Sequence, residues 1–241
     1  MPQKQFQKVL VGCPISSYRE DVIDDYVAAV NSLSYPNYEV LLLDNSADEK
    51  MSGRIKGKVP VQKTRRIEKI GEMLARDRNA LRKKALDEGF DYFLSLEQDV
   101  IPPKDVIERL LANKKQVCSG LYFNMYGGLG PNNEPYAELR PVFSVLMDET
   151  QKDIRVIRNI GLQGVFPSRL MQICSGGVGC ALIARDVLEK IFFRTESAFT
   201  TFDDVFFYED CYTKGIDAFM DSRVMCLHHY KPWPKELRVN V

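Results

Sequence analysis

The stretch YFLSLEQD, residues 92–99, decides how this sequence folds and where its chemistry lies. Its apolar run is typical of a strand buried in a sheet, and it leads into Glu97 and Asp99, two carboxylates separated by one residue. Ligands of open parallel sheets bind at the carboxyl ends of the strands, and hard cations such as Mg²⁺ and Mn²⁺ prefer oxygen ligands. The pair therefore indicates a metal site, with a solvated acidic turn as the alternative.

Strands and helices alternate around this stretch in the first half of the chain. Strands are expected over residues 8–15, 38–43, 91–96 and 117–123, with a short edge strand over 59–62; helices are expected over 21–33, 67–88 and from Asp105, where Glu108 would complete a capping box. This alternation predicts an α/β fold with a mostly parallel sheet that is covered by helices on both faces.

The second half of the chain has a different pattern. We expect a Gly/Asn/Pro-rich loop over 124–135, an antiparallel pair over 141–147 and 154–159, irregular chain over 160–175, a strand over 180–184, a helix over 185–193, a loop with a short helix over 203–215 and a strand within 218–227. This half therefore adds a smaller antiparallel portion to the predicted sheet.

The composition is that of a globular protein. The 241 residues include 33 basic and 33 acidic side chains, so the formal net charge is zero, and 45% of the residues are hydrophobic. Disordered chains combine low hydrophobicity with high net charge, and nucleic-acid binders carry a basic surplus, so both classes are disfavoured. No apolar run approaches the roughly 18 residues that span a bilayer.

The cysteines and the N-terminus bear on the cellular compartment. No C-x-x-C pair occurs, and most cysteines lie inside apolar runs: Cys13, Cys118, Cys174, Cys180, Cys211 and Cys226. We expect reduced, buried thiols rather than a disulfide framework or a zinc site. The polar start of the chain has no apolar signal-peptide core, so we expect a cytoplasmic protein with at most peripheral membrane contact.

Polar side chains also follow other predicted strands. Asp44 ends the second strand, and His228 and His229, the only histidines, follow the last one. A neutral imidazole beside carboxylates suits Mn²⁺, and an ordinary hydrogen-bonded histidine is the alternative. Glu209 and Asp210 come after an aromatic run that would raise a carboxylate pKa for general-base chemistry; the alternative is a pair of carboxylates at a helix N-terminus.

Two basic residues and one glycine-rich run complete the set of candidates. Arg76 and Arg78 point about 200° apart on their helix, so one of them would face the cleft and could pair with a diphosphate, while exposed arginines are the alternative. The glycine-rich run 175–179 matches neither a P-loop nor a dinucleotide fingerprint. It indicates a close backbone approach to a ligand, or a tight turn.

The order of these motifs resembles that of family 2-type glycosyltransferases with the GT-A fold. The segments that carry the likeness are KVLVGCPI (8–15), YPNYEV (35–40), DNS (44–46), RNAL (78–81), EQD (97–99), residues 177–184, Glu209-Asp210 and His228-His229. The resemblance spans about residues 8–230. It departs from the family at Glu97, which stands at the first Asp of the D-x-D motif.

The resemblance implies transfer of a sugar from a UDP- or GDP-linked donor to an acceptor hydroxyl, with Mn²⁺ or Mg²⁺ and inversion by a carboxylate base. One GT-A domain would cover 1–241, with a nucleotide-sugar-binding half over 1–123 and an acceptor-binding half over 124–241. The implied roles are catalysis for Asp210 and Glu209; donor binding for Pro14, Ile15, Ser16, Asp44, Asn45, Arg76, Arg78 and Gln98; metal binding for Glu97, Asp99, His228 and His229; and an acceptor-side position for Gly176 and Gly177.

Two other functions stay open at this point. A sugar nucleotidyltransferase of a related fold would carry a Gly-rich basic loop after the first strand, where this chain has PISSYR at 14–19. A non-catalytic nucleotide- or carbohydrate-binding protein of the same fold is favoured only by the substitution at Glu97. The acceptor could be a carbohydrate, a lipid-linked molecule or a small molecule, and the chain could form a homodimer.

Overall fold

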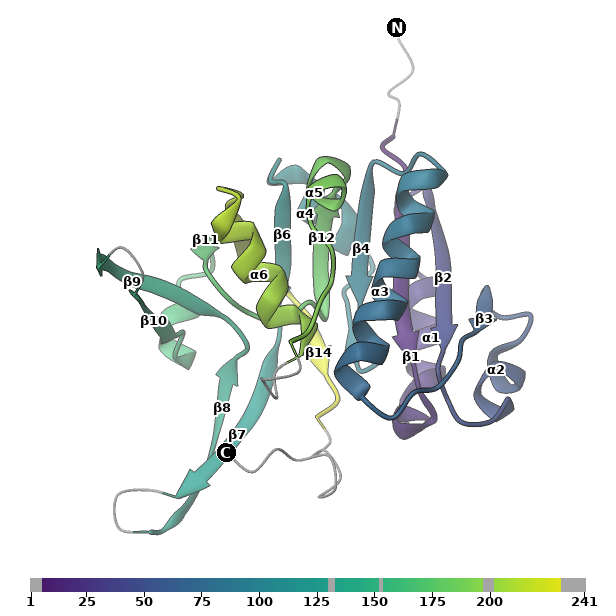
Figure 1. Ribbon diagram of the computed structural model, residues 1–241, viewed down its shortest axis with the longest axis horizontal. Helices are drawn as coiled ribbons and strands as arrows, with labels where there is room; N and C mark the ends of the chain where they lie inside the picture. Colours follow the sequence, from purple (N-terminus) through teal and green to yellow (C-terminus); the bar gives the residue numbers. More distant parts are fainter. Residues whose placement is uncertain (1–5, 130–132, 152–153, 197–201, 231–241) are drawn as a thin grey trace, which may run out of the picture.

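Eight strands form the central sheet of the computed structural model, which describes residues 6–129, 133–151, 154–196 and 202–230 (Figure 1). The order across the sheet is β11-β13-β6-β12-β4-β1-β2-β3. The strands are β1 (Val9–Ile15), β2 (Tyr38–Asp44), β3 (Val61–Lys63), β4 (Tyr92–Leu96), β6 (Val117–Leu121), β11 (Leu170–Ile173), β12 (Cys180–Ala184) and β13 (Ala218–Met225). Both halves of the sequence therefore contribute strands to one sheet.

Strand direction brings the carboxyl ends of β1, β2 and β4 to the same edge of the sheet. β1 is parallel to β2 and β4, β2 is parallel to β3, and β6 is parallel to β13. β12 runs antiparallel between β4 and β6, and β11 runs antiparallel to β13. The predicted α/β fold with a mostly parallel sheet is confirmed, and the residues after β4 lie where such sheets bind ligands.

Helices cover both faces of this sheet, as expected (Figure 1). α3 (Ile70–Asp87) packs with α5 (Arg185–Lys190) and α6 (Asp203–Thr213), whereas α1 (Ile23–Asn31) and α4 (Val106–Ala112) lie on the opposite face; α2 (Lys50–Ile55) lies beside β3. Asp105 makes no capping bond, and Glu108 instead accepts a hydrogen bond from Ser34. The predicted capping box was therefore wrong, because Glu108 ties α4 to the chain after α1.

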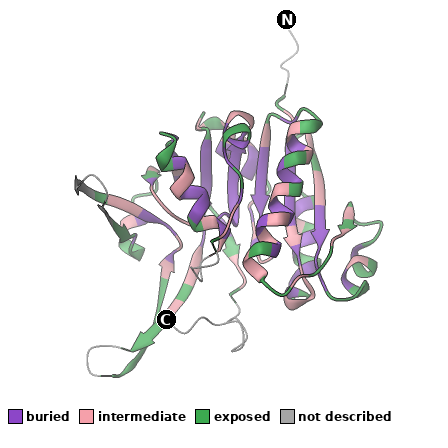
Figure 2. Ribbon diagram, in the orientation of Figure 1, coloured by how far each residue is buried: buried purple, intermediate pink, exposed green. Residues whose placement is uncertain are grey.

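The carboxyl end of β4 lies in the buried core. Figure 2 shows the central strands mostly buried, and Leu81 of α3 and Phe93 of β4 are fully buried. Each such side chain contributes about 1.5–3 kcal/mol to stability. The buried hydroxyl of Tyr26 in α1 donates a hydrogen bond to the carbonyl of Leu96 at 2.8 Å. This bond ties the last residue of β4 to α1.

Two hairpins leave the central sheet in the second half. β7 (Phe123–Leu129) pairs with β8 (Pro135–Pro141), and β9 (Ser144–Gln151) pairs with β10 (Ile154–Asn159). The expected loop over 124–135 was wrong at 124–129, which belong to β7, and at Pro135, which begins β8; residues 130–132 lie outside the described part of the chain. Gly128 weakens the local strand pattern, but the ring of Tyr136 lies over it, 2.9 Å from where a Cβ would be. Cross-strand packing therefore forms a strand that local propensity disfavours.

The irregular chain expected over 160–175 was wrong at Leu170–Ile173, which forms β11 of the central sheet, and it also contains the 3-10 helix η2 (Leu162–Val165). The segment 203–215, expected as a loop with a short helix, is helical over Asp203–Thr213. All six cysteines are free thiols, and five of them are buried. After β13, the short strand β14 (Leu227–His228) pairs with β5 (Val100–Ile101), which follows the carboxylates of β4.

Candidate functional site

The carboxylates after β4 meet a histidine from the far end of the chain. His228 pairs in register with Val100, and this pairing sets its ring beside Asp99. Asp99 Oδ2 lies 3.6 Å from His228 Nε2. His228 Nδ1 lies 2.7 Å from the carbonyl oxygen of Phe123, which can only accept a hydrogen bond, so Nδ1 carries the proton. Nε2 is therefore the nitrogen available to a metal ion or to the Asp99 carboxylate.

Two adjoining cavities open at this edge of the sheet. The first, of about 290 Å³, is called the β1 cavity; it lies between the end of β1 and α3, and Pro14, Ser16, Asn45, Arg66 and Met73 contribute to its lining. The second, of about 270 Å³, is called the β7 cavity; Tyr122, Asn124, Tyr126, Gly177, Asp204 and His228 contribute to its lining. Both cavities are lined by Leu74, Arg78, Glu97 and Asp99. The carboxylates after β4 thus form the boundary between two binding spaces.

Asn45 belongs to the lining of the β1 cavity, and its amide oxygen has no hydrogen-bond partner among the described residues. Its amide nitrogen donates to Asp77 Oδ2 at 3.0 Å. Because a carboxylate only accepts, this bond fixes which end of the amide faces Asp77. Asn45 is 1% exposed, and its Oδ1 is buried without a hydrogen-bond partner among the described residues. A buried acceptor of this kind costs free energy unless a ligand supplies a donor.

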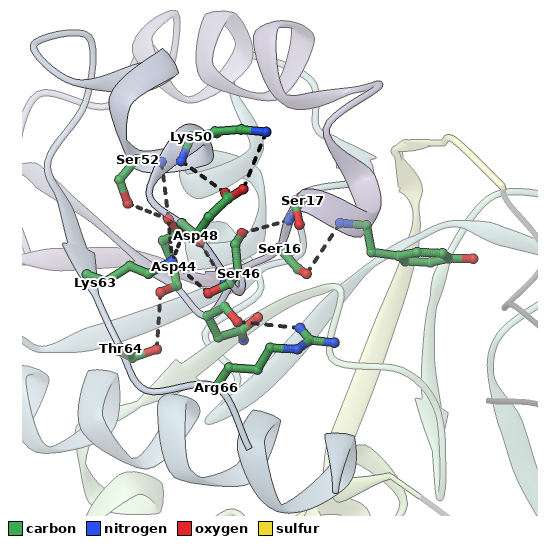
Figure 3. Close-up of polar contacts among 12 residues, drawn as sticks. Ser16, Ser17, Asp44, Ser46, Asp48, Lys50, Ser52, Lys63, Thr64 and Arg66 are labelled. Carbon is green, nitrogen blue, oxygen red and sulfur yellow. Dashed lines mark hydrogen bonds and ion pairs between the residues drawn. The ribbon is translucent and has the colours of Figure 1, made fainter. Parts of the chain in front are cut away.

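Asp44, in contrast, is enclosed by its own loop. Its carboxylate accepts hydrogen bonds from the backbone of Ser46 at 2.8 Å, from both donors of Ser52, and from Lys63 Nζ at 3.2 Å (Figure 3). Burial alone would raise the pKa of Asp44, but these donors hold it below its usual value. The side chain is fully buried and lines neither cavity. Asp44 therefore shapes the loop that carries Asn45.

The loop after β1 forms the opposite wall of the β1 cavity. Gln98, which is 5% exposed, accepts from the backbone of Ser16 at 2.6 Å and donates to the carbonyl of Arg19 at 2.9 Å. Pro14 and Ser16 line the cavity, whereas Ile15 is fully buried in the core. Gln98 thus clamps this loop against the end of β4.

The two candidate arginines of α3 have separate partners. Arg78 is 2% exposed, and its guanidinium bridges Asp203 of α6 and Glu97. Arg76 makes two hydrogen bonds to Asp77, at 2.9 and 2.7 Å, and lines neither cavity. Arg78 is therefore the arginine that faces the site, where it joins α3, β4 and α6.

The N-terminus of α6 brings a carboxylate that the sequence analysis did not select. Asp204 lines the β7 cavity, and burial and the charge of Asp203 raise its pKa to about 6, against the opposing effect of Arg78. Glu209 and Asp210 lie further along the helix and line neither cavity, and Asp210 is held by Arg194 through two hydrogen bonds of 2.9 Å. If the sequence had been interpreted as a helix that begins at Asp203, Asp204 would have been recognised as a carboxylate at a helix N-terminus.

The glycine-rich run makes room for two aromatic rings. A Cβ at Gly176 would lie 2.2 Å from the ring of Phe143, and one at Gly177 would lie 2.1 Å from the hydroxyl of Tyr122. The same hydroxyl accepts a hydrogen bond from the backbone of Gly179 at 2.9 Å. The close approach is thus between protein groups, and Gly177 also lines the β7 cavity.

The donor set at the boundary of the cavities fits a divalent cation bound with substrate. Asp99 offers a carboxylate and His228 offers Nε2, while His229 contacts Asp99 through backbone atoms at 2.8 Å. Within the described part of the chain, no cluster of three or more metal-ligating side chains is formed. Mg²⁺ and Mn²⁺ commonly take one or two protein ligands and complete their shells with phosphate oxygens and waters, so two ligands suffice.

Electrostatics at this boundary favour a cation. Burial, with a smaller contribution from the charge of Asp99, raises the pKa of Glu97 to about 7 despite the neighbouring Arg78. Burial lowers the pKa of His228, but its contact with Asp99 raises the pKa above its usual value. Arg19 Nη1 already lies 2.6 Å from Asp99 Oδ2. The ionised form of Glu97 is therefore disfavoured where it lies, and a cation bound beside it would favour that form.

The chain is similar to solved structures of glycosyltransferases. GalNAc-T7 with UDP, GalNAc and Mn²⁺ superposes with a TM-score of 0.61 at 13% identity, over 95% of this chain and 45% of that one. The mannosyltransferase PcManGT from Pyrobaculum calidifontis, in complex with GDP-Man and Mn²⁺, gives 0.58 at 14%, over 96% and 59%. S. aureus TarS 1-349 with UDP-GlcNAc gives 0.56 at 15%, over 96% and 60%.

These likenesses show that the chain has the GT-A fold, as the sequence motifs predicted. The chain spans between 45% and 60% of the length of these three structures. No family model and no curated protein matches it. Among the described residues, none of the helices is both long and apolar enough to cross a membrane.

Proposed function

We propose that this protein is a glycosyltransferase that moves a sugar from a nucleotide-sugar donor to an acceptor hydroxyl. One observation carries the proposal: Glu97 and Asp99 line two adjoining cavities, one with the unpartnered acceptor of Asn45 and the other with Asp204. A transferase needs this arrangement, because donor and acceptor must meet at one point with a base beside the attacking hydroxyl. The GT-A fold supports the same activity by analogy.

The β1 cavity is suited to the nucleotide. Asn45 Oδ1 would accept a hydrogen bond from a ring N–H of the base, and uracil and guanine both carry such a donor. Adenine and cytosine present a bare ring nitrogen there and can donate only from the neighbouring exocyclic amino group, which lies at a different place on the base. Ser16 and the cationic Arg66 line the same cavity and can donate to base or ribose oxygens. A UDP- or GDP-linked donor therefore fits this cavity best.

The boundary between the cavities is suited to the diphosphate. Asp99 and His228 would hold Mn²⁺ or Mg²⁺ there, with Glu97 alongside. When bound, the metal supplies positive charge for the departing diphosphate. Arg19 holds the Asp99 carboxylate from the other side at 2.6 Å, so the chain itself orients the ligand oxygen before the donor binds.

Asp204 is the proposed general base. Its carboxylate takes the proton from the acceptor hydroxyl, whose oxygen forms a bond to the anomeric carbon as the bond from that carbon to the diphosphate oxygen breaks. Attack on the side opposite the leaving group inverts the anomeric configuration. Arg78 pairs with the adjacent Asp203 and with Glu97, and it thereby fixes the start of α6 relative to the end of β4. A general base of this kind is worth about 10²–10⁴-fold in rate.

Calorimetric titration tests the donor half of this proposal. UDP, GDP, ADP and CDP would each be titrated in the presence of Mn²⁺ and, separately, of EDTA. We expect UDP or GDP to bind, more tightly with Mn²⁺, and ADP and CDP to bind at least about tenfold more weakly, which is the cost of one unpaired buried acceptor. Equal binding of all four, or binding of none, would count against a uridine or guanosine donor.

A further inference from the structure

The β7–β8 hairpin has two unlike faces. In its register Met125 opposes Leu139, while Tyr126 opposes Glu138. One face carries apolar side chains only, and the other carries Asn124, Tyr126, Glu138 and Arg140, with Tyr136 over Gly128. The second face includes both hairpin residues of β7 that line the β7 cavity, Asn124 and Tyr126. One face of the hairpin therefore forms a wall of the reaction site.

Tyr126 is held in place on this wall. The Arg140 guanidinium stacks on its ring, 4.3 Å from the centroid, and Arg140 Nε lies 3.5 Å from Glu138. Burial raises the pKa of Tyr126, Arg140 opposes this, and Asp204 raises it again, so the phenol is neutral and near the proposed base. Tyr126 is thus a fixed aromatic surface beside Asp204.

The cavity is unfavourable for a negatively charged ligand. Glu97, Asp99 and Asp204 contribute carboxylates to its lining, and Arg78, the arginine of that lining, is engaged by Glu97 and Asp203. Arg140 of the hairpin stacks on Tyr126 and pairs with Glu138 at 3.5 Å, while its Nε makes no hydrogen bond among the described residues. An acceptor with a phosphate or carboxylate group would meet repulsion from the three carboxylates of the lining, and Arg78 and Arg140 are each already paired with a carboxylate.

We infer that the acceptor is an uncharged carbohydrate whose ring stacks on Tyr126, with Asn124 hydrogen-bonded to its hydroxyls and the attacking hydroxyl towards Asp204. This inference rests on the proposed function and names its second substrate. A pyranose ring offers an apolar C–H face to an aromatic ring and a rim of hydroxyls to an amide, which matches the two side chains. The volume of about 270 Å³ suits one sugar unit at the reaction point.

The test measures acceptor binding separately from donor binding. Ligand-observed NMR would record saturation transfer to methyl glycosides of common hexoses and N-acetylhexosamines and to the corresponding sugar 6-phosphates, with the bound nucleoside diphosphate present. Three variants would be compared with the wild type: Tyr126→Ala, Tyr126→Phe and, as a control on the opposite face of the same hairpin, Leu139→Ala, whose side chain is 46% exposed and does not line the cavity.

We expect at least one neutral glycoside to bind the wild type, Tyr126→Phe and Leu139→Ala with similar affinity. It should bind Tyr126→Ala about five- to tenfold more weakly, because one stacking contact is lost. Nucleotide binding should be unchanged throughout. Preference for the 6-phosphates, absence of binding by every neutral glycoside, or an equal affinity in Tyr126→Ala would overturn the inference. Failure of the wild type to bind any nucleotide would instead count against the proposed function.

Discussion

Asp77 of α3 fixes the amide of Asn45: its Oδ2 accepts a hydrogen bond from the Asn45 amide nitrogen at 3.0 Å, which leaves Asn45 Oδ1 buried and without a partner among the described residues. Arg76 donates to the other carboxylate oxygen of Asp77 at 2.9 Å. The orientation of the amide is therefore set by a charged group that does not itself line the cavity.

Nucleotide binding should depend on both residues of this pair. We expect Asn45→Ala to weaken binding of the preferred nucleoside diphosphate about tenfold, the loss of one hydrogen bond of about 1.4 kcal/mol. Asp77→Ala should cause a similar loss, because the amide can then rotate. Calorimetry would measure both, with Asp87→Ala at the exposed end of α3 as the control. Wild-type affinity in Asn45→Ala would show that this amide does not contact the base.

The sequence motifs identified Asp210 as a candidate base but not Asp204, and the difference has a physical reason. The sequence patterns predicted the central strands other than β11, and they placed Glu97 and Asp99 after β4 and His228 at the end of the last strand, because buried runs and strand-end positions are local features. The start of α6 was misjudged, since the aromatic run 206–208 obscured a helix that begins at Asp203. The contact between Asp203 and Arg78 joins residues 125 positions apart, and no local pattern records it.

Catalysis should fail when Asp204 loses its charge. We expect Asp204→Asn to lower kcat by about 10²–10⁴-fold with little change in nucleotide affinity, because the base acts on the acceptor and not on the donor. Asp210→Asn, a matched change on the same helix, should retain most of the turnover. Steady-state transfer assays would measure both. If Asp210→Asn lost its turnover and Asp204→Asn kept it, Asp210 would be the base. If both variants kept their turnover, neither carboxylate would be the base.

The pH dependence should follow the ionisation of Asp204. Its pKa of about 6 lies above the usual 3.8, and a base must be ionised to act, so kcat should rise with pH and level off above about pH 7. A flat profile between about pH 5 and pH 7 would contradict this assignment. The measurement is the rate of transfer at saturating donor and acceptor.

The ionisation of Asp204 should also make the free energy of unfolding depend on pH, in a direction that follows from its raised pKa. A raised carboxyl pKa means that the folded state binds a proton more tightly than the unfolded state, so the wild type loses stability as the pH rises from about 4 through about 6. Asp204→Asn removes this loss, and we expect it to unfold in urea with about 1 kcal/mol more free energy than the wild type at about pH 8. This difference in unfolding free energy should shrink towards about pH 4. If Asp204→Asn were less stable than the wild type at about pH 8, the prediction would be contradicted.

Metal dependence should separate the two adjacent histidines. We expect Mn²⁺ to tighten nucleotide binding to the wild type and to His229→Ala, which keeps the backbone contact to Asp99. Asp99→Ala and His228→Ala should lose most of this effect, since each removes one of two protein ligands. Titration with Mn²⁺ and then EDTA would measure it. If Mn²⁺ still tightened nucleotide binding fully in Asp99→Ala and in His228→Ala, the metal would have to bind elsewhere.

The Asp44 carboxylate should stabilise the folded protein. Asp44→Asn removes the charge that Lys63 and the donors of Ser46 and Ser52 contact, and we expect a loss of about 2 kcal/mol in the free energy of unfolding. Asp48→Asn, in the same loop but with its side chain 53% exposed, is the matched control and should change it by less than about 0.5 kcal/mol. Urea denaturation would compare the two.

The most direct test of the account is product analysis with nucleotide sugars. Wild-type protein and Asp204→Asn would be incubated with UDP- and GDP-sugars, Mn²⁺ and neutral glycosides, and the released nucleotide and the new glycoside would be identified by mass spectrometry. The account predicts that the wild type releases UDP or GDP and forms one glycoside, and that Asp204→Asn loses both products. Release of pyrophosphate would indicate a nucleotidyltransferase, and tight nucleotide binding without any turnover would indicate a non-catalytic protein; either result would contradict the central claim.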